Sequence, residues 1–150
     1  MKKIDYTEGL RFECQGSSNC CISRGSYSFV YLSKKDIKIL SNYININNND
    51  FLKIYCDITD GFTHLKENKD NPDCQFLINK KCSIYKARPT QCRTWLFWAT
   101  NINAKTWNNN VSKFCPCPGI GKGNIINKEQ IDKKIKTDDL NEQKMLDEIN

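Results

Sequence analysis

The sequence predicts a small α+β domain with short strands, several helices and loop-rich metal sites built from cysteine. Its 150 residues suit one ordinary domain with a real core. Short runs rich in aromatic and β-branched residues, typical of strands, alternate with runs whose apolar residues recur at helical spacing. Nine cysteines gather in three groups with one left over, and this clustering indicates thiol-based sites.

We divide the chain into three segments. A polar N-terminal segment, 1–11, precedes a cysteine-cluster metal-binding domain, 12–127, and a highly charged segment, 128–150, follows. A thin apolar stripe runs through the last segment at Ile131, Ile135, Leu140, Leu146 and Ile149. This spacing predicts one or two amphipathic helices, packed on the domain or frayed from it.

The first half of the domain should contain a strand and two helices. Residues 27–32, rich in aromatic and β-branched side chains, predict the strand. Ser33, followed three residues later by Asp36, has the spacing of a capping box and predicts a helix start. The asparagine cluster 45–49 should end this helix, and Asp50 is a candidate cap for a second, shorter one.

The second half should begin with a strand at 62–65 and continue with a hairpin. The hairpin would join short strands at 75–78 and 82–85 through a polar turn. Pro89 suits the first turn of a helix, which predicts that residues 90–93 are helical.

Three groups of cysteines are candidate metal ligands. They are Cys14 with Cys20 and Cys21, then Cys74, Cys82 and Cys92, and finally Cys115 and Cys117. Thiolate prefers zinc, iron or copper(I) to magnesium or calcium, and tetrahedral zinc needs four donors. No Cys-x-x-Cys knuckle occurs, so this is not an ordinary zinc finger. Adjacent side chains on extended backbone point to opposite sides, so the pair Cys20–Cys21 favours two nearby centres, or one centre and the core.

Four further residues have an expected role of their own. Cys56 ends an amphipathic, helix-like stretch and is expected in the core, because free cysteine is among the most buried residues. His64, the single histidine, lies in a strand-like segment and is expected to be structural. Arg88 and Arg93 flank Cys92, where fixed positive charge would stabilise thiolates.

A disulfide scaffold is the main alternative to metal binding. Such scaffolds usually begin with a signal peptide, yet this sequence begins Met-Lys-Lys-Ile-Asp-Tyr-Thr-Glu with no apolar run after the lysines. Nine is also an odd number and would leave one thiol over. We therefore expect metal-ligating thiols in a reducing cytoplasm. No apolar run approaches ~18 residues, so we expect no membrane span.

The formal charge of +6 invites a nucleic-acid interpretation. Metal ligation weakens this interpretation, because two zinc sites with eight thiolates would lower the net charge to about +2. The basic excess then mostly neutralises the sites, which argues against a nucleic-acid partner. The glycine-rich run 118–123 lacks the spacing of a phosphate loop and predicts a turn.

Several motifs, in the order of the chain, resemble the YkgJ-type cysteine-cluster family, a zinc- or iron-chelating domain. They are Phe12-Glu-Cys14-Gln-Gly with Cys20-Cys21, Val30-Tyr-Leu, Cys74-Gln-Phe-Leu, Cys82-Ser-Ile-Tyr85, Arg88-Pro89-Thr-Gln-Cys92-Arg93 with Trp98 beyond, and Cys117-Pro-Gly-Ile-Gly. The resemblance covers roughly residues 12–123. It implies a small bacterial protein that binds zinc or iron through clustered cysteines, and it implies no particular reaction.

The sequence departs from the family's first motif, Cys-x-x-Cys-x-x-Cys-Cys, at Ser17. A neutral hydroxyl is a poor zinc ligand, so one family ligand is missing. Cys115, two residues before the matching Cys117, is a candidate replacement. The other family-type cysteines would fill one four-thiolate site and leave a second with three thiolates and an open position, as a catalytic metal requires.

We interpret the chain as a metal-binding protein of the bacterial cytoplasm, with zinc as first choice and iron, including an iron–sulfur cluster, next. The eight grouped cysteines would be ligands, and Arg88 and Arg93 would compensate charge. One alternative is a redox or metal-assisted enzyme that uses an incompletely filled site, although no nucleophile–base arrangement indicates a reaction. Another is a module in which metal holds the fold and a basic, aromatic surface recognises protein or nucleic acid.

Overall fold

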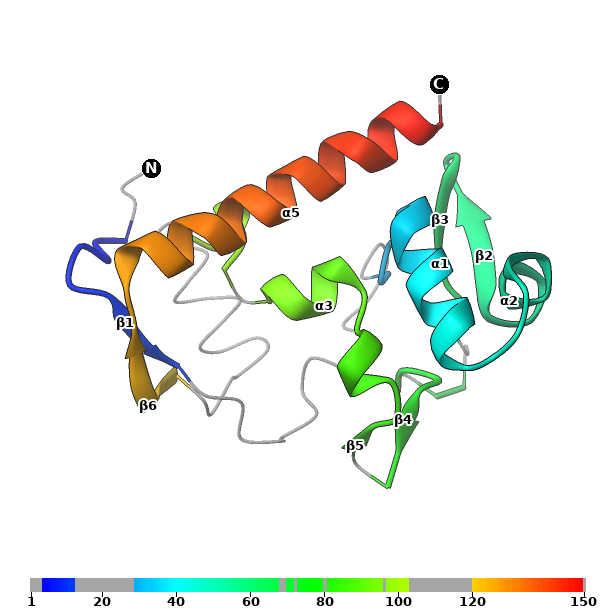
Figure 1. The fold of residues 1–150 in the computed structure, drawn as a ribbon, viewed down its shortest axis with the longest axis horizontal. Helices are drawn as coiled ribbons and strands as arrows, with labels where there is room; N and C mark the ends of the chain where they lie inside the picture. The colour runs from blue at the N-terminus through cyan, green and yellow to red at the C-terminus, as the bar shows by residue number, and fades with distance from the viewer. Residues whose placement is uncertain are drawn as a thin grey trace.

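The computed structural model describes residues 4–12, 29–67, 70–71, 73–79, 81–95, 97–102 and 120–149. Helix α5 (Lys128–Glu148) runs from a strand pair at one end of the molecule towards α1 (Lys34–Tyr43) at the other (Figure 1). The strand pair joins β1 (Leu10–Phe12) to β6 (Ile120–Ile126) in antiparallel register. Helices and short antiparallel strand pairs in one small domain confirm the predicted α+β class.

The capping box predicted at the start of α1 is present. The Ser33 hydroxyl accepts a hydrogen bond from the Asp36 amide, and the Asp36 carboxylate accepts one from the Ser33 amide, both at 3.2 Å. The second helix, α2 (Asn48–Tyr55), starts earlier than predicted. Its cap is Asn47, whose side chain accepts from the Asp50 amide at 2.8 Å, so Asp50 lies within the first turn.

A hairpin follows α2 directly. Its strands are β2 (Cys56–Thr59) and β3 (Phe62–Leu65), and both residues of the turn, Asp60 and Gly61, have positive φ. An Asp-Gly pair with this geometry matches the right-handed twist of a hairpin. The strand predicted at 62–65 is confirmed. The helix expected to include Cys56 ends at Tyr55, and Cys56 begins β2.

The strand predicted at 27–32 is present in part within the described residues. Leu32 donates its amide to the Thr63 carbonyl and Leu65 donates to the Val30 carbonyl, both at 3.0 Å, so this segment runs beside β3. The pairing is limited to an isolated bridge between Tyr31 and His64. It nevertheless anchors the start of α1 to the hairpin.

The hairpin and helix predicted in the segment rich in candidate ligands are present, but the strand predicted at 82–85 begins at Lys81 and ends at Cys82. Strands β4 (Leu77–Ile78) and β5 (Lys81–Cys82) form the hairpin, and the 3₁₀ turn η2 (Tyr85–Ala87) leads to α3 (Thr90–Thr94). A further 3₁₀ turn, η3 (Ala99–Asn101), follows.

The turn predicted at 118–123 is wrong for residues 120–123, which belong to β6. The pairing of β6 with β1 is irregular between Arg11 and Phe12, and in β6 Gly123 adopts a positive φ there. The Gly123 carbonyl accepts from Arg11 Nη1 at 2.9 Å.

Apolar side chains of the described residues form two clusters. The first core, between α1, α2 and the two hairpins, contains Leu32, Ile37, Leu40, Phe51, Cys56, Leu65, Phe76, Ile84 and Ala87. The second core, between the β1–β6 pair and the first half of α5, contains Phe97, Ile102 and Ile131. The segment from β4 to η3 therefore connects one core to the other.

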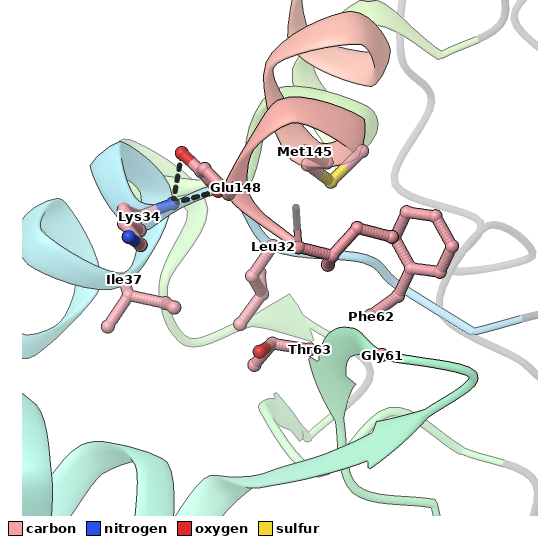
Figure 2. A pocket seen from close by; sticks show the side chains of 9 residues that line it. Leu32, Lys34, Ile37, Gly61, Phe62, Thr63, Met145 and Glu148 are labelled. Atoms are coloured by element: carbon pink, nitrogen blue, oxygen red, sulfur yellow. Dashed lines mark hydrogen bonds between the residues drawn. The ribbon is translucent and has the colours of Figure 1, made fainter.

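The far end of α5 reaches the start of α1. The Glu148 carboxylate accepts hydrogen bonds from the Lys34 amide at 3.1 and 3.3 Å, which caps the start of α1 (Figure 2). Negative charge at a helix N-terminus is favourable because the first amides lack partners. The charged C-terminal stretch thus forms one continuous helix that packs in the second core and reaches the start of α1. No helix among the described residues is long and apolar enough to cross a membrane.

Candidate metal centre

The middle group of candidate ligands lies on three short, successive elements. Cys74 precedes β4, and its carbonyl accepts from the Leu77 amide at 2.9 Å. Cys82 ends β5, opposite Leu77, and Cys92 lies in α3. All three side chains are half-buried, and Cys74 and Cys82 pack against the first core. The core therefore supports these thiols from one side without enclosing them.

The other two groups of candidate ligands lie outside the described residues. They are Cys14, Cys20, Cys21, Cys115 and Cys117. No disulfide joins any two of the described cysteines. Within the described ranges, no three or more of the histidine, cysteine and carboxylate side chains gather into a metal-binding group. The predicted ligand set therefore stays a prediction.

Cys56 differs from the three half-buried cysteines. It is 6% exposed and belongs to the first core. Burial, with a smaller contribution from Asp57, raises the pKa of its thiol to about 11. A thiol with this pKa stays protonated at neutral pH and is a poor nucleophile and metal ligand. Its place in the core agrees with the expectation from sequence, although it begins a strand rather than ending a helix.

His64 is fully committed to structural contacts. Its side chain is 3% exposed and its ring stacks on Phe29, with the centroids 3.8 Å apart. Nδ1 lies 2.8 Å from the Leu65 carbonyl, which can only accept, so Nδ1 carries the proton. Nε2 then accepts from the Thr59 hydroxyl at 2.8 Å. With both nitrogens engaged, the structural role expected for the single histidine is the one observed.

The first turn of α3, which carries Cys92, is held from helix α1. Pro89 occupies the cap position of α3 and offers no side-chain hydrogen bond. The Asp36 carboxylate serves as the cap instead. Its Oδ1 accepts from the Thr90 amide at 3.0 Å and from the Thr90 hydroxyl at 2.8 Å. Asp36 is 2% exposed and Thr90 is 6% exposed, so these bonds are shielded from water.

Gln91, the residue before Cys92, ties α3 to the segment beside β3. Its side-chain oxygen accepts from the Tyr31 amide and its side-chain nitrogen donates to the Phe29 carbonyl, both at 3.1 Å. One amide thus satisfies two backbone groups of an extended segment, as a neighbouring strand would. The two residues before Cys92 are therefore fixed to different parts of the chain, one to α1 and the other to the segment at 29–31.

A cationic group made of Arg88, Arg93 and Lys134 lies beside α3. The Arg88 guanidinium is 3.9 Å from the centre of the Tyr85 ring, and Arg93 Nη2 donates to the Thr90 hydroxyl at 3.0 Å. Partial burial, then repulsion from the two arginines, lowers the pKa of Lys134. In the part of the chain that the structure describes, no carboxylate forms an ion pair with these three side chains; the ion pair there is Lys128–Asp132.

Sequence reasoning found the two arginines and missed Lys134. The sequence shows only that Lys134 and Asp138 lie four residues apart on α5 and so share one face; nothing local relates Lys134 to the arginines. Asp138 Oδ1 lies 3.4 Å from the Thr94 hydroxyl of α3. Sequence reasoning had assigned the packing face of α5 from its apolar stripe alone, without the charged residues that face α3.

A pocket elsewhere on the surface is unrelated to the cysteines. It lies between the start of α1, the β2–β3 turn and the end of α5 (Figure 2), and its volume is about 80 Å³. Ligand sites for small molecules usually measure about 300–1,000 Å³. The lining includes Leu32, Phe62 and Met145 and no cysteine. This pocket is too small for an ordinary substrate.

Comparison with known proteins decides the family. A family model described as CxxCxxCC, "Putative zinc- or iron-chelating domain", matches residues 13–116, well over half of the chain. The chain belongs to this family. The match confirms the resemblance drawn from the cysteine motifs, and it supports metal binding in general, with zinc or iron as the metal. Cys115 lies within the matched range and Cys117 just beyond it.

A curated relative extends the comparison. The chain is 33% identical over 126 residues to "Uncharacterized protein MJ0661" of Methanocaldococcus jannaschii. The aligned region covers 80% of this chain and 65% of that relative, so the relative contains further sequence without a counterpart in the alignment. No solved structure matches the chain.

Proposed function

We propose that this protein chelates zinc, or failing that iron, through cysteine thiolates supplied by all three groups. The ligands would be Cys14, Cys20, Cys21, Cys74, Cys82, Cys92 and Cys117, with Cys115 as an additional donor. The observation that carries the proposal is the contrast among the described cysteines. Three family-motif thiols are half-buried, two of them against the first core, while the non-motif Cys56 is buried and held protonated.

The cationic group supports an anionic centre near α3. Partial burial, and after it repulsion from Arg88 and Arg93, lowers the pKa of Lys134. A four-thiolate zinc site carries a net charge of −2 and would offset that repulsion. Arg88 and Arg93 would then compensate thiolate charge, as expected from sequence, with Lys134 as a third contributor from α5.

Bound metal would supply cross-links between loops and, at a position left open by Ser17, a Lewis acid or an electron carrier. We assign no reaction. His64 is engaged at both ring nitrogens, so it is not available as a general base. A reducing cytoplasm is the compartment that we propose, because metal-ligating thiolates persist there.

The test is metal analysis of protein purified without oxygen, combined with its visible absorption spectrum. About two zinc ions per chain and no colour are expected for two thiolate sites. Iron with sulfide and charge-transfer absorption would instead favour an iron–sulfur cluster. A variant with Cys74, Cys82 and Cys92 all changed to Ser should lose metal, and Cys56→Ala should keep it. Protein without metal, with its cysteines paired as disulfides, would overturn the proposal.

A further inference from the structure

The buried carboxylate of Asp36 has two structural partners on different parts of the chain. Oδ2 accepts from the Ser33 amide at 3.2 Å and completes the capping box of α1. Oδ1 accepts from the amide and the hydroxyl of Thr90, which lies 54 residues further on. A capping box needs only the first of these contacts. The second contact, with Thr90, therefore calls for a separate explanation.

That explanation lies in the helix that begins at Thr90. With five residues, α3 is too short to be stable alone. Its first turn is closed by the bond from the Arg93 amide to the Pro89 carbonyl at 3.0 Å, and Cys92 lies within this turn. The Thr90 hydroxyl also accepts from Arg93 Nη2 at 3.0 Å. Asp36 thus holds Thr90 directly, and the Thr90 hydroxyl in turn holds the Arg93 side chain. These two residues lie on either side of Cys92 in the turn.

We propose that Asp36 is a positioning residue for the metal centre, acting through Thr90 on the backbone of Cys92. This inference rests on the proposed function, since it takes Cys92 to be a ligand. Residues that orient a metal-ligating side chain without contacting the metal increase metal affinity, because the side chain then need not be ordered when the metal binds. Charged acceptors are suited to this task, because their hydrogen bonds are stronger than neutral ones.

Thr90→Val is the decisive variant. It removes the hydroxyl that Asp36 and Arg93 share and leaves the capping box of α1 intact. We expect zinc affinity, measured by competition with a coloured chelator, to fall about tenfold or more. Thr90→Ser, which keeps the hydroxyl, should restore it. The cobalt(II) form should show an altered thiolate charge-transfer spectrum in Thr90→Val and a parental one in Thr90→Ser.

Two controls separate positioning from loss of stability. Asp50→Asn alters a contact at the start of α2, where the Asp50 carboxylate accepts from the Asn47 side chain at 3.1 Å, and should leave zinc affinity unchanged. Phe51→Leu weakens the first core at a fully buried residue and should lower the melting temperature while keeping the cobalt spectrum.

The outcomes distinguish the two proposals. Parental affinity and a parental cobalt spectrum in folded Thr90→Val and Asp36→Asn, alongside weakened binding in Cys92→Ser, would overturn the positioning role alone. A parent protein that binds no metal, or Cys92→Ser with parental affinity, would overturn the role of Cys92 and the positioning role with it.

Discussion

The Thr94 hydroxyl of α3 and the Asp138 carboxylate of α5 lie 3.4 Å apart and join the two helices. The same hydroxyl donates to the Thr90 carbonyl at 3.0 Å and accepts from Trp98 Nε1 at 2.9 Å. Since a hydroxyl has a single proton, an ionised Asp138 competes with Thr90 for it. The contact between α3 and α5 should therefore respond to the charge of Asp138.

Asp138→Asn should stabilise the protein at pH 7.5. Burial raises the pKa of Asp138 from 3.8 to about 6, the Thr94 hydroxyl offsets part of this, and Glu142 and Asp139 add repulsion. The folded state thus holds this proton more tightly than the unfolded chain, so the group's contribution to stability grows as pH falls from about 7 to about 4. The melting temperature of Asp138→Asn should exceed that of the parent at pH 7.5, and the gap should narrow by pH 5.

Comparison with the parent at each pH removes any effect of metal release that both proteins share. Asp147→Asn makes the same charge change at an exposed position further along α5 and should show no such pH-dependent gap. A gap for Asp138→Asn that is constant across pH would contradict the role assigned to its ionisation.

Alkylation should distinguish Cys56 from the cysteines of the metal centre. The pKa of Cys56 is raised to about 11 by burial, and thiolate is the reactive form. After chelator treatment at pH 7.5, iodoacetamide should modify Cys74, Cys82 and Cys92 faster than Cys56, as measured by peptide mass spectrometry. In concentrated guanidinium chloride all four should react at similar rates. Equal rates under native conditions would show that the first core does not protect Cys56.

Replacing His64 should affect stability and not metal content. His64→Leu leaves the carbonyl of the buried Leu65 and the hydroxyl of the half-buried Thr59 without their partner. We expect the free energy of unfolding, measured in urea, to fall by about 1–3 kcal/mol. Thr59→Val removes only the contact at Nε2 and should cost less. A loss of bound metal in folded His64→Leu would contradict the structural role of this side chain.

Gly61→Ala tests the turn between β2 and β3. The φ of Gly61 is +85°, while an added Cβ would meet only Ile149 atoms at 3.7–3.8 Å, an ordinary contact. The penalty is therefore a backbone one, about 1–2 kcal/mol in urea denaturation. Gly61→Asn should cost less, because asparagine tolerates positive φ. Equal losses for Ala and Asn would point to a steric cause instead.

The parts of the fold that sequence predicted well depend on local signals. Ser33 and Asp36 are three residues apart, so their capping box can be recognised without knowing the fold. The β4–β5 hairpin was likewise predicted from its own turn. In β6, by contrast, two of the glycines that suggested a turn, Gly121 and Gly123, occupy a strand because β1, more than a hundred residues earlier, pairs with it. That partner leaves no local trace.

In the candidate site, too, the features with a local sequence signal were predicted and those that depend on distant partners were not. The cysteine motifs, with Arg88 and Arg93, could be found from residue type and spacing. Lys134 could not be assigned, because its relation to the arginines depends on how α5 lies against α3. The second role of Asp36 was hidden as well, since a residue that satisfies a local motif gives no reason to seek another partner.

The dependence of α3 on distant side chains bears on how its chemistry can be studied. Asp36 holds its first residue, Gln91 attaches to the backbone at 29–31, and Thr94 faces Asp138. A synthetic peptide spanning residues 82–98 would contain two of the thiols and none of these outside contacts. Such a peptide would sample many conformations in water, so its metal affinity would describe an unfolded ligand. Ligand assignments are better made by single substitutions in the whole chain.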